Sequence, residues 1–186
     1  MKTEIEVKAR IENKEILLQA LAQLGCMFSD PIRQDDTVFV LKVGTLEEFL
    51  SNETFLRIRI QDDGAAILTA KKRVRKSEGG LVKIEHETVV QSSDESRAIL
   101  EMMDYREAVR VKKSRQVSHY KDYEICLDDI EGLGSFIELE QMGESDDAPE
   151  IQQGMLEFLL SLGISPDAQV KKGYDILMLE KRGSTR

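Results

Sequence analysis

The sequence opens on a segment in which charged and apolar residues alternate without a break, from Glu4 to Ile11. Because successive side chains of a strand point to opposite faces, its charged residues share one face and its aliphatic residues share the other. The charged residues are Glu4, Glu6, Lys8 and Arg10, and the apolar residues are Ile5, Val7, Ala9 and Ile11. A sheet built from such strands must place one of its two faces against an apolar partner.

The same alternation recurs along the chain, and turn sequences such as Asp62-Asp63-Gly64 separate many of the segments. Strands are expected over residues 4–11, 32–41, 54–61, 65–75, 81–90, 107–120, 123–128 and 135–142. Helices are expected over residues 14–24, 94–103 and 149–162, with shorter helical segments at 46–50 and 174–180. Strands joined by hairpins favour one antiparallel sheet, and a sheet of this length usually curls or closes.

Two ways of closing the sheet are open. Its apolar face could fill the inside and leave the charges in water, which is the usual meaning of alternating charge. The amphipathic helices could instead cover the apolar face from outside and leave a polar lumen. Because the alternation recurs on most strands, we expect the second. The predicted fold is α+β and mainly β: an eight-stranded antiparallel closed barrel or tunnel with a charged lumen, helices on the outside, and a single domain over residues 1–186.

Composition limits the classes of function. The chain of 186 residues is 41% hydrophobic and carries a net charge of -9, which disfavours nucleic acid or an anionic membrane as its main partner. No apolar run approaches the roughly 20 residues that a bilayer span needs, and the charged start predicts no signal peptide. Cys26 and Cys126 lack metal-site spacing, so we interpret both as buried small hydrophobes of a reducing cytoplasm.

Acidic and basic residues gather on the predicted charged face. The set comprises Glu4, Glu6, Lys8, Arg10, Arg57, Arg59, Lys71, Arg73, Lys83, Glu85, Glu87, Lys113, Arg115, Asp128, Glu138 and Glu140. Carboxylates two residues apart on a strand lie about 6.6 Å apart and repel by roughly 2.5 kcal/mol at an effective dielectric constant near 20. Basic neighbours, solvent or a divalent cation would relieve this repulsion. Hard oxygen ligands suit Mg²⁺ or Mn²⁺, and arginine and lysine bind phosphate oxygens.

These residues resemble the motifs of a known family. Glu4-x-Glu6-x-Lys8 matches the ExExK motif of the CYTH superfamily, the triphosphate tunnel metalloenzymes. The segment from Asp128 to Glu140 resembles the family's D-x-x-x-G-L-G-x-F-x-E-x-E block, and the resemblance runs from Lys2 to about Tyr174. It is greatest to the class IV adenylate cyclase (CyaB-like) group, and it implies a tunnel that holds a triphosphate and a divalent metal.

The resemblance also implies roles for individual residues. The implied metal ligands are Glu4, Glu6, Glu138 and Glu140, assisted by Asp128 or Glu87. The implied substrate-binding residues are Lys8, Arg57, Arg59, Lys71, Lys83, Glu85, Lys113, Arg115 and Tyr174, with Lys83 where many members have arginine. The implied catalytic residues are Glu6, Lys8, Asp128 and Glu138.

Three functions stay open at this point. An adenylate cyclase would convert ATP to cyclic AMP and pyrophosphate. A triphosphatase would hydrolyse thiamine triphosphate or inorganic triphosphate with the same residues. A module that binds nucleotides or polyphosphate without turnover is the alternative from another class. The resemblance further implies a homodimer, whereas the sequence shows no interface.

Overall fold

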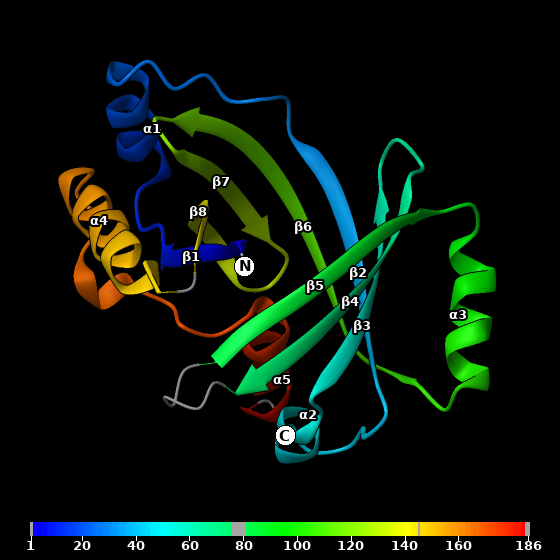
Figure 1. The fold of residues 1–186 in the computed structure, drawn as a ribbon. Coiled ribbons are helices and arrows are strands. Elements are labelled where there is room, and N and C mark those ends of the chain that lie inside the picture. The colour runs from blue at the N-terminus through cyan, green and yellow to red at the C-terminus, as the bar shows by residue number, and fades with distance from the viewer. Residues whose placement is uncertain (1, 76–80, 145, 185–186) are drawn as a thin grey trace. The chain divides into compact units, whose positions relative to one another are not determined.

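A computed structural model of the chain describes residues 2–75, 81–144 and 146–184, and Figure 1 draws it as a ribbon. The strands are β1 (Lys2–Arg10), β2 (Ile32–Val40), β3 (Thr54–Gln61), β4 (Ala66–Arg75), β5 (Leu81–Val90), β6 (Arg106–Tyr120), β7 (Tyr123–Ile130) and β8 (Gly134–Glu144). The α-helices are α1 (Lys14–Gln23), α2 (Leu46–Ser51), α3 (Ser93–Met102), α4 (Ala148–Ser161) and α5 (Tyr174–Ser184), and η1 (Pro166–Ala168) is a short 3₁₀ helix.

The strands form one eight-stranded sheet in the order β1-β8-β7-β6-β2-β3-β4-β5. The pairs of neighbours whose register is described are antiparallel. The predicted mainly β fold with an eight-stranded antiparallel sheet and accompanying helices is therefore confirmed. Closure of the sheet into a ring and organisation as a single domain stay predictions.

The chain divides into two compact units. Unit 1 comprises Met1–Ile32 and Lys113–Lys172, and unit 2 comprises Arg33–Lys112 and Gly173–Arg186. The long strand β6 contributes its second half to unit 1 and its first half to unit 2. Each unit has its own core and its own group of charged residues.

Helix boundaries follow local capping chemistry. The side chain of Asn13 accepts a hydrogen bond from the backbone N–H of Ile16, which starts α1. Gly25 follows that helix with a φ of 82°, a left-handed conformation that glycine adopts without strain. Thr45 and Glu48 form a reciprocal capping box at the start of α2. The last helix extends to Ser184, four residues beyond its predicted end at Glu180.

The core of unit 1 lies between the strands and two helices. Its strand residues come from alternate positions of β1, β7 and β8, and its helix residues come from α1 and α4, which lie beside these strands in Figure 1. The strand residues are Val7, Ala9, Ile125, Leu127, Ile137 and Leu139, and the helix residues are Leu17, Leu21, Met155 and Leu159. The apolar face of these strands is therefore the face that the helices cover.

Aromatic packing holds α4 against the hairpin of β6 and β7. The rings of Tyr120 and Phe158 are stacked with their centroids 5.1 Å apart. The ring of Tyr123 lies against the same phenylalanine, with centroids 5.7 Å apart. Both tyrosines flank the turn of the hairpin, so α4 is fixed to the end of these strands as well as to their apolar face.

The core of unit 2 is built in the same way. Phe39 of β2 and Ile58 of β3 are buried with Leu100 of α3. Leu56 and Leu68 pack around them. The prediction that apolar strand residues lie beneath helices is therefore confirmed within each unit, and the charged residues of the same strands point to the other face.

Candidate functional site

Four strands of unit 1 bring charged residues together on the face opposite the helices, called here the ionic face. Its members are Glu4, Glu6 and Lys8 of β1, Lys113 and Arg115 of β6, Glu124, Cys126 and Asp128 of β7, and Glu138 and Glu140 of β8. The register sets Lys8 opposite Glu138 and Glu6 opposite Glu140. It also sets Arg115 opposite Asp128, so that an acid faces a base at two of these positions, whereas Glu6 and Glu140 are two acids face to face.

Arg115 is the centre of the ionic face. Its Nε donates to Oδ1 of Asp128 at 2.7 Å and its Nη2 donates to Oδ2 at 2.6 Å, which gives two parallel hydrogen bonds to one carboxylate. The same Nη2 lies 2.6 Å from Oε2 of Glu138, whereas Nη1 lies 3.5 Å from Oε1 of Glu140. Bidentate arginine–carboxylate pairs combine strength with fixed geometry. Arg115 therefore holds Asp128 and Glu138 firmly and Glu140 only weakly.

Two lysines complete this buried network. Nζ of Lys8 lies 2.8 Å from Oε1 of Glu138, and both side chains are less than a tenth exposed. Nζ of Lys113 lies 3.7 Å from Oδ2 of Asp128, whose side chain is fully buried. Glu138 thus lies between the cations of Lys8 and Arg115, and Asp128 lies between those of Lys113 and Arg115.

The neighbouring cations determine the protonation of Glu138. Burial alone would raise the pKa of this carboxyl, but the charges of Lys8 and Arg115 outweigh burial and bring its pKa to about 2. Burial would in turn lower the pKa of Lys8, yet Glu138 and Glu6 raise it above its ordinary value. Glu138 is therefore an ionised carboxylate held in a fixed position.

Glu140 stands in the opposite situation, two residues further along the same strand. Burial raises its pKa, the charge of Glu138 raises it further, and the carboxylates of Glu4 and Glu124 add to this, so that its pKa reaches about 8. Arg115 offsets only part of the shift. This end of the ionic face thus carries more negative charge than its basic residues balance.

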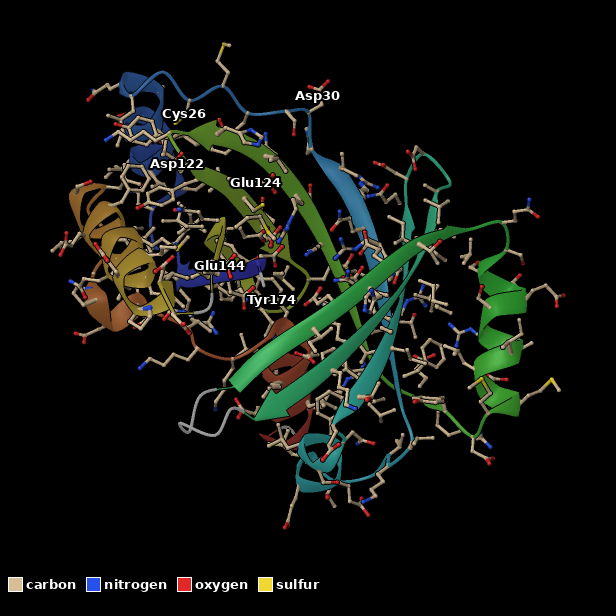
Figure 2. All side chains as sticks on the ribbon, viewed as in Figure 1. Cys26, Asp30, Asp122, Glu124, Glu144 and Tyr174 are labelled. Atoms are coloured by element: carbon tan, nitrogen blue, oxygen red, sulfur yellow. The ribbon has the colours of Figure 1, made fainter. Side chains whose placement is uncertain are left out.

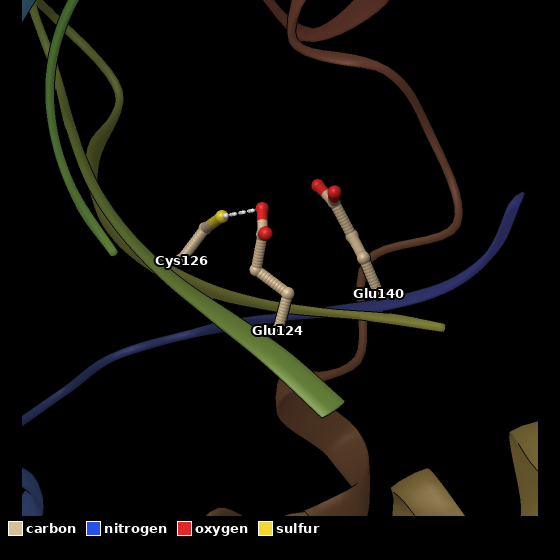
Figure 3. Close-up of side chains that lie close together, drawn as sticks. All are labelled: Glu124, Cys126 and Glu140. Carbon is tan, nitrogen blue, oxygen red and sulfur yellow. Dashed lines mark hydrogen bonds between the residues drawn. The ribbon is translucent and has the colours of Figure 1, made fainter. Parts of the chain in front are cut away.

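Two residues at this end lie outside the predicted site. Figure 2 labels Glu124 on β7, and Figure 3 shows it with Cys126 and Glu140. One potential ligand atom from each of the three lies within 4.8 Å of the others. Cys126 is buried as predicted, but its thiol lies on the ionic face rather than among apolar side chains, and it donates to Oε1 of Glu124 at 3.7 Å.

The residues of unit 1 fit a divalent cation. Carboxylate oxygens are the ligands that Mg²⁺ and Mn²⁺ prefer. A cation would also counteract the burial and the neighbouring carboxylates that raise the pKa of Glu140, because positive charge favours the ionised carboxyl. Glu4, Glu6, Glu124 and Glu140 therefore offer oxygen donors of the kind that these cations take.

Unit 2 contains a second group of charged residues, centred on Asp36 of β2. Oδ1 of Asp36 accepts from Nε of Arg59 at 2.7 Å and Oδ2 accepts from Nη2 at 2.9 Å. Nη1 of Arg57 lies 3.7 Å from the same carboxylate. The side chains of Asp36 and Arg59 are 8% and 12% exposed, so this bidentate pair is largely removed from water.

Arg57 is held from its other side by β4 and β5. Its Nη2 donates to Oγ1 of Thr69 at 3.0 Å and lies 3.2 Å from Oε2 of Glu87. Its buried Nε has no hydrogen-bond partner in the part of the chain that the structure describes. Burial lowers the pKa of Arg57, and Asp36 offsets part of that shift. The two arginines are thus fixed side by side on β3 by the carboxylates of Asp36 and Glu87 and the hydroxyl of Thr69.

The remaining predicted residues of unit 2 occupy the neighbouring strands. Nζ of Lys71 lies 2.6 Å from Oε1 of Glu85. Glu87 contacts Arg57 and Thr69. Lys83 lies in β5, and its side chain falls outside the described residues, as does that of Arg73. Tyr174 is the first residue of α5, labelled in Figure 2.

The structure adds Asp36, Thr69, Glu124 and Cys126 to the predicted residues. Glu124 and Cys126 could have been found by extending the alternation of β7 backward from Asp128. Asp36 follows Asp35, so any strand through this segment places one carboxylate on each face. Thr69 carries no charge and had no signal in the sequence.

None of the helices in the described ranges is both long enough and apolar enough to span a bilayer.

Comparison with known proteins gives a consistent result. The family model described as CYTH domain matches residues 2–174. A curated relative of Methanocaldococcus jannaschii, named "Putative adenylate cyclase MJ0240", is 29% identical over 181 residues, which are 97% of this chain and 98% of that protein.

Solved structures show the same fold. The PH1819 protein of Pyrococcus horikoshii superposes with a TM-score of 0.78 at 26% identity, over 96% of this chain and 99% of its own. The HpAC1 protein of Hippeastrum superposes with a TM-score of 0.61 at 20% identity, over 98% of this chain and 96% of its own. The second likeness is one of fold alone.

Replacing Asp36 by asparagine should destabilise the protein, because it removes the carboxylate that binds the largely buried Arg59 through two hydrogen bonds. We expect the free energy of unfolding to fall by about 3 kcal/mol, measured by urea denaturation followed by circular dichroism. Asp35→Asn is the matched control. Asp35 pairs with Arg110, and these side chains are 25% and 49% exposed, so its loss should cost less than about 1 kcal/mol. Equal losses in the two variants would contradict the assignment.

The raised pKa of Glu140 predicts a pH dependence of stability in the metal-free protein. Its folded pKa of about 8 lies above the ordinary value of 4.5, so its protonated form favours folding. That contribution is complete below about pH 4.5 and disappears as the pH rises through about 8, by up to about 1.4 kcal/mol per pH unit. Urea denaturation in EDTA at pH 5.5, 6.5 and 7.5 should show this loss in the wild type.

Glu140→Gln should remove this pH dependence, since glutamine does not titrate. Glu131, an exposed residue between β7 and β8, provides the control variant Glu131→Gln, which should keep the wild-type slope. A constant difference between wild type and Glu140→Gln over this range would show that Glu140 titrates normally.

Proposed function

Because the chain belongs to the CYTH domain family, we propose that it is a metal-dependent enzyme that acts on the triphosphate group of a small molecule. The observation that supports this best is the ionic face of unit 1. There Glu138 is held ionised between Lys8 and Arg115, while Glu140 carries a raised pKa that a cation would relieve. Class IV adenylate cyclase chemistry, from ATP to cyclic AMP and pyrophosphate, is the first candidate.

The acidic residues would hold the metal. Glu4, Glu6, Glu138 and Glu140 are the proposed ligands, with Asp128 or Glu87 assisting. Bound Mg²⁺ or Mn²⁺ would supply positive charge that neutralises the triphosphate and the departing phosphate. Arg115 supports this arrangement because it fixes Asp128 and Glu138 through short hydrogen bonds. Glu6, Lys8, Asp128 and Glu138 are the proposed catalytic residues.

The basic residues would bind the phosphates. Arg57 and Arg59 are held side by side by Asp36, with Thr69 and Glu87 on the far side of Arg57. Guanidinium groups fixed in advance lose less conformational freedom when they bind a phosphate. The other proposed basic residues are Lys8, Lys71, Lys83, Lys113 and Arg115, and Glu85 and Tyr174 complete the proposed substrate-binding set.

A triphosphatase is the second candidate. The charged residues described above would bind the metal and the phosphates, and both cyclisation and hydrolysis require metal and phosphate binding. The Hippeastrum relative is described as having a dominant triphosphatase activity, which favours testing hydrolysis of thiamine triphosphate and inorganic triphosphate. Binding of nucleotide or polyphosphate without turnover is the third candidate. A homodimer and a cytoplasmic location also stay predictions.

The deciding experiment offers ATP, thiamine triphosphate and inorganic triphosphate separately, each with Mg²⁺ or Mn²⁺, and separates the products by chromatography. We expect cyclic AMP and pyrophosphate from ATP, and no product in EDTA. Diphosphate products with release of inorganic phosphate would establish the triphosphatase instead. Tight binding of all three compounds without product over hours would overturn the enzymatic proposal.

Glu6→Ala tests the proposed metal ligands. Loss of this carboxylate should reduce metal-dependent turnover at least about 100-fold, since ligand loss weakens both metal binding and charge neutralisation, while circular dichroism stays unchanged. Glu12→Ala, which removes an exposed glutamate just beyond β1, should leave the rate within about twofold of wild type. Full metal-dependent activity in Glu6→Ala would contradict the ligand assignment.

A further inference from the structure

Glu124, Cys126 and Glu140 combine two kinds of metal-binding atom in one place. The register of β7 and β8 sets Glu124 directly opposite Glu140, and Cys126 is the next residue on the same face of β7. One ligand atom of each lies within 4.8 Å of the others, and Figure 3 shows the sulfur and both carboxylates. All three potential ligands, one sulfur and two carboxylates, therefore come from residues within strands and none from a loop.

The short ion pairs of the ionic face involve other residues than Glu124, Cys126 and Glu140. The short bonds of Arg115 go to Asp128 and Glu138, and its contact with Glu140 is 3.5 Å long. Glu124 contacts the thiol of Cys126 at 3.7 Å and the exposed His119 at 3.3 Å. Two carboxylates thus stand close together with little positive charge between them, and a cation would supply it.

The sulfur decides which cation fits. Mg²⁺ takes oxygen ligands in near-ideal octahedral geometry, whereas thiolate together with carboxylate suits Zn²⁺ and related first-row ions such as Co²⁺. Cys126 is fully buried, which shields its sulfur from competing water, and the sulfur points to the carboxylate of Glu124.

We infer that Glu124, Cys126 and Glu140 form a binding site for a thiophilic divalent cation such as Zn²⁺ or Co²⁺, with Cys126 as a thiolate ligand. The inference rests on the proposed function in one respect, because Glu140 is also a proposed ligand of Mg²⁺ or Mn²⁺. A thiophilic cation would therefore compete with the cation that supports turnover. Occupied by Zn²⁺, the site would reduce activity that Mg²⁺ supports.

The chain supplies its own control for the sulfur ligand. Cys26 is the other cysteine and is also buried, but it lies in the apolar core of unit 1 with Leu17 and Leu21. Figure 2 labels it in the segment after α1. If any buried thiol could give a metal-binding signal, substitution of either cysteine would weaken that signal. If the signal comes from the proposed site, only substitution of Cys126 should remove it.

The test is a titration of the metal-free full chain with Co²⁺, followed by the sulfur-to-cobalt charge-transfer absorption in the near ultraviolet. Wild type and Cys26→Ser should develop this band and reach saturation at one equivalent, and Zn²⁺ should remove it. Cys126→Ser and Cys126→Ala should lack the band. Glu124→Gln should bind Co²⁺ at least tenfold more weakly, with circular dichroism unchanged.

Several outcomes would overturn the inference. The first is the absence of the sulfur-to-cobalt band in folded wild-type protein. The others are a band that persists in both Cys126 variants and a band that is lost in Cys26→Ser. The result is separable from the proposed function. Absence of turnover with Mg²⁺ or Mn²⁺ leaves the cobalt band as predicted, and absence of the band leaves the product assay unaffected.

Discussion

The bidentate pair between Arg115 and Asp128, shared with Glu138, is the interaction on which unit 1 depends. Removing charges from water costs several kcal/mol per ion, and the loss is recovered only where opposite charges meet in good geometry. Neighbouring strands provide this geometry when the register places an acid directly opposite a base, as it does for Arg115 and Asp128. The same strands bury an apolar core under α1 and α4 on their other face, so neither face could be exchanged for the other.

This network is better explained by positioning than by stability. Replacing a buried ion pair by well-packed apolar residues is often neutral or stabilising. What the ions provide is a fixed pattern of protonation, with Glu138 ionised and Glu140 two residues away carrying a raised pKa. Unit 2 follows the same principle, because Asp36 holds two arginines in place while their positive charge exceeds its own. The ionic face of unit 1 holds more acidic than basic residues, which suits a metal, and the fixed arginines of unit 2 suit phosphate.

Much of the site could be predicted from the sequence, since alternation assigns each strand residue to a face without knowledge of any other strand. Lys8, Arg115, Asp128 and Glu138 were assigned to the charged face in this way. The missed residues show the limit of that reasoning. Cys126 has the small, apolar appearance of a core residue, and only the strand face that it shares with Glu124 and Asp128 shows that its thiol lies toward carboxylates. Asp36 becomes informative only when β3 places Arg59 opposite it.

Periodicity, turn residues and caps act within a few residues, so the amino-acid sequence alone predicts the strands, the helices and the two faces of the sheet. Which acid meets which base follows from the folded chain. That choice depends on the register between strands that are distant in the chain, and on burial, which turns otherwise equivalent carboxylates into an ionised Glu138 and a Glu140 with a raised pKa. Coulomb interactions in a partly buried site change over a few ångströms, and such distances are fixed only by the folded chain.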